Sequence, residues 1–282
     1  MYDELQFSED LPQLAVDAFE IAGDLCGDCR NFHMLWPYVR IAGASGGDVG
    51  TPLYRSVLSR LLSKGGKRIL IAGSADTGLL AVVARAGSSD TEITVLDRCE
   101  TPLELCRRFA SRWSLPIRTV HQDLTELAAQ TSFDVVFVHM LLQFIRSDQQ
   151  LEVLSRMRRS LRPDGRLVLA FRTSDHIEDA FVPDYRRGYA EHLIEQLDAR
   201  KIPLPEPRDV FGRRIEIYAE QRRGRVGTHG SREEVEQLIE TAGFAIEELI
   251  PIEGVISEPF RQFGSRIGLQ RFLVKAKPRS EN

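Results

Sequence analysis

The segment between Lys67 and Leu80 constrains the fold of this chain more than any other. A short apolar run at 68–72 enters a loop of small residues, Gly73-Ser74-Ala75-Asp76-Thr77-Gly78, and an apolar stretch with helical spacing follows it. This order is typical of a buried strand that leads into a helix, where small residues let a ligand approach the main chain and the helix end offers free N–H groups. The next predicted strand ends in the carboxylate Asp97. Together the two features indicate a site for a nucleoside-bearing cofactor.

Strands and helices alternate after this point, which predicts a parallel sheet covered on both faces. The strands are expected at 68–72, 92–96, 117–121, 133–138 and 166–171, and the helices at 79–86, 102–111, 124–129 and 147–161. The alternation stops at an insertion, 176–230, which contains a helical stretch at 185–199, a proline-rich bend and many arginines. A capping pattern at Ser231 then predicts a helix to Thr241, followed by strands at 245–251 and 269–276.

The N-terminal part has a different character. Residues 11–35 show helical spacing of apolar side chains, and Thr51-Pro52 introduces a second helix around 54–62 after a glycine-rich loop. We therefore expect a helical lid or appendage over residues 1–65, and a main α/β domain over 66–282 with a cap insertion at about 176–230.

The composition is that of a soluble globular protein. The net charge of −4 and the pI of about 5.9 argue against a nucleic-acid binder. No apolar run approaches the roughly 20 residues that cross a bilayer, and the acidic N-terminus lacks the pattern of a signal peptide. These features predict a cytoplasmic protein that interacts with neither membranes nor nucleic acids, and whose four cysteines are thiols.

The order of these elements resembles the class I S-adenosylmethionine-dependent methyltransferase family over residues 67–277. The turn Arg162-Pro163-Asp164-Gly165 with its following strand is similar to the family's segment before strand 5, and the helix that ends in Ala242-Gly243-Phe244 is similar to its last helix. The resemblance implies a Rossmann-like sheet of seven mostly parallel strands with an antiparallel last strand. It also implies S-adenosyl-L-methionine as cofactor and S-adenosyl-L-homocysteine as product.

The resemblance also assigns roles to individual residues. Gly73, Ala75 and Thr77 occupy the positions of the family's three loop glycines, and only the first is glycine here. Asp97 matches the acid that binds both ribose hydroxyls, and Asp123 matches the residue that binds the adenine amino group. The implied cofactor-binding set is Gly73, Ser74, Ala75, Gly78, Asp97, Arg98, Asp123, Leu124, His139 and Met140.

His139 is the candidate general base, because it follows the predicted strand 133–138 where the family lines the methyl-transfer site. The alternative is a hydrogen-bonded histidine at a strand end. The other candidates for the substrate pocket are Trp36, Tyr38, Arg40, Gln143 and Phe144. For the aromatic and basic residues near 36–40, packing of the appendage against the sheet is an equally good interpretation.

Two further clusters favour structural interpretations. Cys26 and Cys29 with His33 have the spacing of metal ligands, but no fourth ligand follows from the sequence, so we predict no metal site. Cys99 and Cys106 are expected to be ordinary packing residues. An arginine-rich stretch favours a salt-bridged surface over a grip on an acidic substrate; its members are Arg208, Arg213, Arg214, Arg222, Arg223 and Arg225.

The sequence thus predicts a methyltransferase that acts on an oxygen, nitrogen or sulfur of a small molecule. Its substrate would lie between the ends of strands 133–138 and 166–171, the N-terminal helices and the insertion. Two alternatives remain open: a nicotinamide-dependent oxidoreductase, because Gly73-x-Ala75-x-x-Gly78 also fits a degenerate dinucleotide fingerprint, and a cofactor-binding protein without methyl transfer. A homodimer is also left open.

Overall fold

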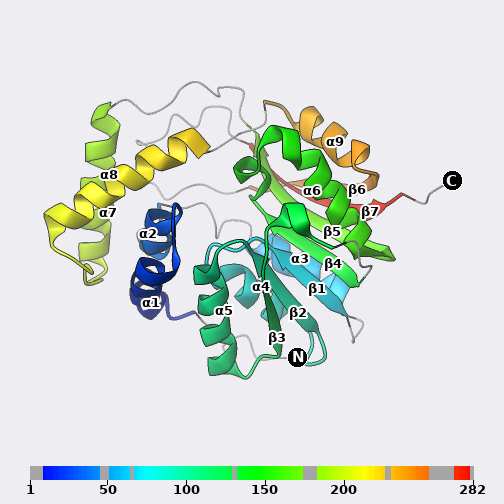
Figure 1. The fold of residues 1–282 in the computed structure, drawn as a ribbon, viewed down its shortest axis with the longest axis horizontal. Helices are drawn as coiled ribbons and strands as arrows, with labels where there is room; N and C mark the ends of the chain where they lie inside the picture. Colours follow the sequence, from blue (N-terminus) through cyan, green and yellow to red (C-terminus); the bar gives the residue numbers. More distant parts are fainter. Residues whose placement is uncertain are drawn as a thin grey trace.

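A seven-stranded sheet forms the centre of the described part of the molecule (Figure 1). The structure, a computed structural model, describes residues 9–44, 51–63, 67–128, 132–173, 183–225, 230–253 and 270–279. The strand order is β3-β2-β1-β4-β5-β7-β6, in which β7 runs antiparallel to both of its neighbours. The strands are β1 Arg68–Ala72, β2 Glu92–Asp97, β3 Ile117–His121, β4 Phe133–His139, β5 Leu161–Thr173, β6 Phe244–Pro251 and β7 Gln270–Pro278. The predicted fold class is confirmed.

Helices cover both faces of this sheet. On one face lie α3 Thr51–Leu62, α4 Gly78–Ala86 and α5 Glu100–Trp113; on the other lie α6 Ser147–Ser160 and α9 Arg232–Thr241. Alternate residues of one strand enter different cores: Ile69 and Ile71 pack with the first group of helices, and Leu70 packs with the second. Because both faces are buried, the central strands read as continuous apolar runs.

A third core lies beside the sheet and belongs to four helices, which we call the helical cap. They are α1 Leu11–Leu25, α2 Arg30–Ile41, α7 Pro183–Ala199 and α8 Arg208–Arg225. Figure 1 shows the blue N-terminal helices packed beside the yellow-green helices of the insertion. Segments far apart in the sequence thus share one apolar core, whereas α3 packs on the sheet.

The prediction of a single helix over 11–35 is wrong, because the helix is interrupted at Cys26. This residue has an extended backbone (φ −95°, ψ 138°) and ends α1, and Cys29 precedes α2. Apolar residues recur at helical spacing on both sides of the break, so periodicity alone does not reveal it. The helix expected at 124–129 is likewise shorter, a single 3-10 turn, η1 Leu124–Glu126.

Helix α8 was not predicted, because its arginines obscure an apolar stripe. Phe211, Ile215, Tyr218 and Ala219 recur at helical spacing and are almost fully buried in the cap. The arginines face outward and form ion pairs: Arg208 with Asp198, Arg213 with Asp209, and Arg214 with Glu206. The side chains of Arg222, Arg223 and Arg225 lie outside the described residues.

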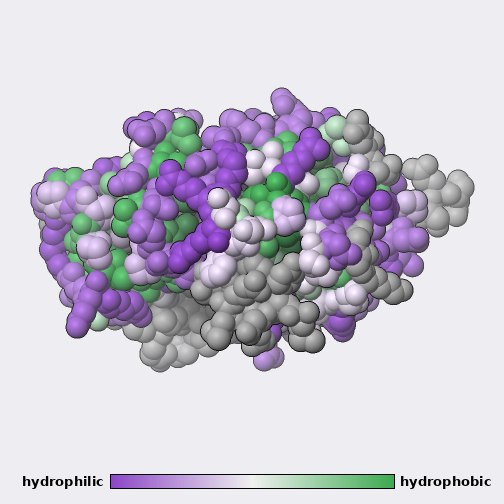
Figure 2. All heavy atoms as spheres, turned by 90° about the horizontal axis from the view of Figure 1, so that it is seen from below, coloured by the Kyte–Doolittle hydropathy of each residue, from purple (hydrophilic) through white to green (hydrophobic). Residues whose placement is uncertain are grey.

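The surface is mainly hydrophilic (Figure 2), as expected for a chain in which 28% of the residues are charged. On the face shown in Figure 2, hydrophilic side chains cover most of the described surface, and smaller apolar groups lie between them. Among the described helices, none has the combination of length and apolar character that crossing a membrane would require.

Candidate active site

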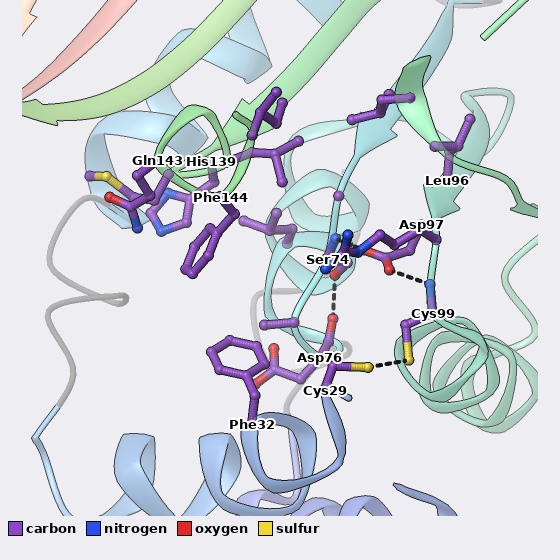
Figure 3. A pocket seen from close by; sticks show the side chains of 18 of the residues that line it. Cys29, Phe32, Ser74, Asp76, Leu96, Asp97, Cys99, His139, Gln143 and Phe144 are labelled. Carbon is purple, nitrogen blue, oxygen red and sulfur yellow. Dashed lines mark hydrogen bonds between the residues drawn. The ribbon is translucent and has the colours of Figure 1, made fainter. Parts of the chain in front are cut away.

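A pocket of about 780 Å³ lies at the C-terminal ends of the central strands (Figure 3). The strand order reverses between β1 and β4: β2 and β3 are added on one side of β1, and β4 and β5 on the other. In open α/β sheets, ligands bind at this switch point. The pocket volume is within the usual range for small-molecule and cofactor sites. Residues of α3 complete the wall together with residues of α2 and α8, so the helical cap covers part of the pocket.

Gly73 is the glycine that the loop after β1 requires. Its φ is +79°, and a Cβ placed there would lie 2.9 Å from the side chain of Leu141. Its N–H donates to the carbonyl oxygen of Leu96 at 2.8 Å, which ties the loop to the end of β2. Ala75 and Thr77 are not among the described residues with positive φ, so side chains fit where the family has further glycines.

Asp97, at the end of β2, is held by two backbone groups. Its Oδ2 accepts the N–H of Ser74 at 2.9 Å, and its Oδ1 accepts the N–H of Cys99 at 2.7 Å. Burial raises the pKa of Asp97 above its ordinary value, and these hydrogen bonds oppose the shift. Each carboxylate oxygen keeps a second acceptor position, so Asp97 can still receive hydrogen bonds from a ligand.

Asp123, after β3, is fixed in a similar way. It caps η1, and its Oδ1 accepts hydrogen bonds from the N–H and the hydroxyl of Thr125, both at 2.8 Å. Asp97 and Asp123 both line the pocket, and they lie at the ends of neighbouring parallel strands. The sheet therefore places two oriented acceptors along one side of the pocket.

An ion-pair cluster joins α2 to the loop after β1. The guanidinium of Arg40 contacts Asp76 at 2.6 Å and Glu9 at 2.9 Å, and the Thr77 hydroxyl donates to Glu9 at 2.6 Å. Burial raises the pKa of Asp76 despite the opposing charge of Arg40. Burial also acts on Glu9, but the charge of Arg40 and hydrogen bonds from Arg40 and Thr77 hold the pKa of Glu9 below its ordinary value. The pocket thus has a polar end with both signs of charge.

The end of β4 places His139 and Met140 in the wall. Met140 has a φ of +50°, a left-handed conformation that is uncommon for a side chain other than glycine, and its N–H donates to Ala170 at 2.8 Å. His139 packs edge-on against Tyr54. Its Nδ1 is buried and has no hydrogen-bond partner among the described residues. Burial, with smaller effects of Arg271 and Arg40, lowers the pKa of His139 to about 4, so the ring is neutral at neutral pH.

Aromatic rings form another part of the pocket wall. Phe32 of α2 stacks on Trp36 and on Tyr218 of α8, with ring centroids 5.6 and 6.1 Å apart. Phe144, in the 3-10 turn η2 Leu142–Phe144, approaches Phe32 edge-on and remains 38% exposed. In Figure 3, Phe144 lies beside His139 and Gln143, and Phe32 lies below them near Asp76 and Cys29.

The structure brings nearly all predicted site residues together. The ones that line the pocket are Trp36, Arg40, Gly73, Ser74, Ala75, Gly78, Asp97, Arg98, Asp123, Leu124, His139, Met140, Gln143 and Phe144. Tyr38 does not: it is fully buried in the cap core, between Phe19 and Phe211. On α2, positions 36 and 40 face the pocket, whereas position 38 faces away from it.

Some lining residues were missed by sequence reasoning. Tyr218 could have been found from the apolar stripe of α8, and Asp76 from its place in the loop after β1. No sequence signal points to Tyr54 or to the partner role of Glu9. The expected wall at the end of β5 is not seen, since its described residues do not line the pocket. Cys99, expected to be a packing residue, is buried in the third core and also lies against Cys26 and Cys29.

Comparisons with known proteins agree with this geometry. A family model described as a methyltransferase domain matches residues 69–165. A carboxy-S-adenosyl-L-methionine synthase of Desulfotalea psychrophila is 30% identical over 166 residues, which cover 53% of this chain and 67% of that protein. A protein of the same name from Pseudomonas putida is 30% identical over 123 residues, 39% of this chain and 49% of that protein. The chain thus matches only about half the length of the Pseudomonas relative.

Solved structures share the fold at low sequence identity. The 1,6-didemethyltoxoflavin-N1-methyltransferase of Burkholderia thailandensis, solved with S-adenosylhomocysteine, superposes with a TM-score of 0.53 at 17% identity, covering 82% of this chain and 79% of that one. An S-adenosylmethionine-dependent methyltransferase of Mesorhizobium loti gives 0.53 at 19% identity, covering 82% and 98%. These findings favour S-adenosylmethionine over a nicotinamide cofactor. The chain belongs to the class I S-adenosylmethionine-dependent methyltransferase family, and its cofactor is S-adenosylmethionine.

Proposed function

We propose that the protein transfers the methyl group of S-adenosylmethionine to a small molecule held beneath the helical cap. One observation carries this proposal: a single pocket contains the acidic residues at the strand ends, the neutral His139 and the aromatic rings of α2 and α8. Cofactor and acceptor could therefore meet inside one cavity. The acceptor atom, whether oxygen, nitrogen or sulfur, is left open.

The residues of the polar end suit each part of the cofactor. Asp97 would accept hydrogen bonds from the two ribose hydroxyls, and Asp123 from the adenine amino group. At the methionine end, Arg40 would bind the carboxylate, while Asp76 would face the ammonium group. When bound, the cofactor supplies a methyl group already activated on a sulfonium. The protein then needs mainly to align the acceptor and to exclude water.

The aromatic part of the wall suits a flat or largely apolar acceptor. Phe32, Trp36, Phe144 and Tyr218 offer ring faces and edges against which such a molecule can pack. Gln143 is 7% exposed and provides an amide beside them. Cavities of this size with a mainly apolar and aromatic lining suit small organic ligands.

His139 suits the role of a hydrogen-bond acceptor for the nucleophile. A pKa of about 4 keeps its ring neutral, and its buried Nδ1 lacks a partner among the described residues. A base this weak would orient the acceptor and take its proton only after the methyl group has moved. This role fits an amine or another nucleophile that attacks without prior deprotonation.

The named relatives support a second candidate reaction. The proteins that are 30% identical are called carboxy-S-adenosyl-L-methionine synthases, a name for modification of the cofactor itself. A product assay separates the two. The protein would be incubated with S-adenosylmethionine labelled in the methyl group and with a metabolite extract. Label on a new compound with release of S-adenosylhomocysteine supports methyl transfer; a heavier, carboxylated cofactor supports the alternative.

Calorimetry with Asp97→Asn tests the cofactor site. Loss of one charged acceptor should weaken S-adenosylhomocysteine binding about 10- to 100-fold, since a hydrogen bond to a charged group contributes about 1.5–3 kcal/mol. Asp209→Asn, at a surface ion pair, is the matched control and should bind as the wild type does. Unchanged affinity in Asp97→Asn would remove this residue from the site. Binding of NADH without S-adenosylhomocysteine binding would refute the cofactor assignment.

A further inference from the structure

Four side chains with metal-binding atoms converge at the edge of the pocket. Cys26, Cys29, His33 and Cys99 each offer one ligand atom, and all of these atoms lie within 4.8 Å of one another. Three of the residues are buried, with exposed fractions of 4% for Cys26, 5% for His33 and 7% for Cys99. Figure 3 shows the sulfurs of Cys29 and Cys99 pointing toward each other. Cys99 supplies the fourth ligand that the sequence spacing lacked.

The distances between the sulfurs suit a tetrahedral metal ion. Cys99 Sγ lies 3.4 Å from the sulfurs of both Cys26 and Cys29. In tetrahedral zinc sites the Zn–S distance of about 2.3 Å places the sulfurs about 3.8 Å apart. A disulfide requires about 2.05 Å. Small side-chain adjustments would therefore admit a zinc ion among these atoms.

The backbone around the cluster places positive ends of helix dipoles beside two of the sulfurs. Cys29 precedes the first turn of α2 and Cys99 precedes the first turn of α5. The guanidinium of Arg30 donates to the carbonyl oxygen of Cys26 at 3.1 and 3.2 Å. This adds a positive charge beside the cluster.

His33 is oriented as metal-binding histidines usually are. It follows Cys29 by one helical turn, so both side chains lie on the same face of α2. Its Nδ1 lies 3.3 Å from the carbonyl oxygen of Ala75. A proton on Nδ1 donates to that carbonyl and leaves the lone pair on Nε2. Histidine ligands of zinc commonly hold their other ring N–H in this way.

We propose that Cys26, Cys29, His33 and Cys99 bind a zinc ion. Three thiolates and one neutral imidazole complete a tetrahedral shell, so the ion is structural and has no open position for a substrate. Binding displaces a proton from each of the three thiols and leaves the site with a net charge of −1, which Arg30 partly balances. No electron is transferred.

Such an ion would cross-link two parts of the molecule. Cys26 and Cys29 belong to the turn between α1 and α2, and His33 lies in the first turn of α2, whereas Cys99 belongs to the loop after β2. This loop follows Asp97, the last residue of β2, whose Oδ1 accepts the N–H of Cys99. The zinc ion would therefore fix the cap to the sheet at the point where the cap closes the pocket.

The experiment measures metal in the whole protein, independently of any enzymatic activity. Protein produced with zinc in the medium and freed of loosely bound metal should contain one zinc per chain by elemental mass spectrometry. After exchange with Co²⁺, it should show the visible bands of a tetrahedral cobalt site and the near-ultraviolet bands of thiolate ligation. These spectra need no variant, so they decide the question even if a substitution prevents folding.

Two variants and a matched control locate the site. Cys29→Ser and Cys99→Ser should reduce the zinc content at least 10-fold, whereas Cys106→Ala, at a buried cysteine outside the cluster, should keep it. A strong chelator should lower the Tm of the wild type and of Cys106→Ala, and should leave that of Cys99→Ser unchanged. Four reactive thiols without uptake of zinc or cobalt would overturn the proposal. A disulfide between Cys99 and either partner in protein purified under reducing conditions would also overturn it.

Discussion

At the scale of single residues, His139 is the side chain whose surroundings most clearly set its chemistry. It ends β4, lies against Tyr54 and keeps a buried Nδ1 without a described partner. Burial is the main reason that its pKa falls from 6.5 to about 4, because a charged imidazolium loses its hydration there. The sequence could place this histidine after a strand, but it could not show that the ring stays neutral.

The pKa of His139 predicts a loss of stability in acid. At pH 8 and above the ring is neutral in both the folded and the unfolded chain and contributes almost nothing to the pH dependence. As the pH falls from 6.5 to about 4, His139 becomes protonated in the unfolded chain but stays mostly neutral in the folded protein. The free energy of unfolding should therefore decrease by up to about 3 kcal/mol over this range from this group alone.

Urea unfolding of the wild type and of His139→Gln at several pH values would measure this contribution. The difference in unfolding free energy between the two proteins should change by about 2–3 kcal/mol between pH 7 and pH 4. His121→Gln, at an exposed histidine, is the control for the loss of an imidazole. Parallel pH profiles of His139→Gln and the wild type would show that the ring does not have a lowered pKa.

At the scale of elements, the loop between β1 and α4 depends on one glycine. Gly73 has a positive φ and lies against the side chain of Leu141, so both the backbone and the available space exclude a Cβ. The positions of Ala75 and Thr77 have no such requirement. A glycine-poor version of this loop can therefore keep the fold, which the sequence motif alone left uncertain.

Gly73→Ala should destabilise the protein by about 1–3 kcal/mol, because an alanine at this φ is strained and its Cβ would collide with Leu141. Gly212→Ala is the matched control. Gly212 lies within α8, where the nearest atom to an added Cβ is 3.8 Å away, so alanine should be neutral or stabilising by about 0.5–1 kcal/mol. Thermal unfolding of both variants measures the contrast. Equal effects of the two substitutions would contradict the strained loop.

At the scale of the whole molecule, contacts between cap and sheet complete the pocket. Arg40 of α2 reaches Asp76 in the loop after β1, and the turn before α2 lies against Cys99. The rings of Phe32 and Tyr218 bring the N-terminal helices and the insertion together above the strand ends. The pocket is therefore a product of docking, and weakening the docking should weaken both stability and ligand binding.

Arg40→Met should cost about 3–5 kcal/mol at neutral pH, because it leaves two buried carboxylates without their shared cation. Burial tends to raise the pKa of Glu9, and the charge of Arg40 keeps it low. Without Arg40 the pKa of Glu9 should therefore rise. Protonation would then relieve the repulsion, so the deficit should shrink as the pH falls toward 5. Urea unfolding at pH 7.5 and pH 5 tests both points.

Arg213→Met, at an exposed ion pair with Asp209, is the control and should change the unfolding free energy by less than about 1 kcal/mol. A small effect of Arg40→Met at pH 7.5, similar to that of Arg213→Met, would show that the buried ion pairs contribute little to the docking of the cap.

The sequence predicted those elements whose cause is local. The strands at 68–72 and 117–121 have the predicted bounds, and the Ser231 side chain accepts the N–H of Glu234 as the capping pattern indicated. Strand-end acids such as Asp97 and Asp123 were placed together because parallel strands end at one edge of a sheet. Helix α8 was missed because its arginines mask the buried stripe that includes Tyr218.

The sequence by itself determined the α/β layout, the position of the loop after β1 and the acids at the strand ends, because each follows from short-range periodicity and chain order. The tertiary structure alone decided that Tyr38 turns into the cap core, that Arg40 is paired with Glu9 and Asp76, and that Cys99 joins Cys26, Cys29 and His33. These contacts join segments more than 30 residues apart, and spacing along the chain does not encode which helix face docks on which loop. Packing of the cap against the sheet determines these contacts.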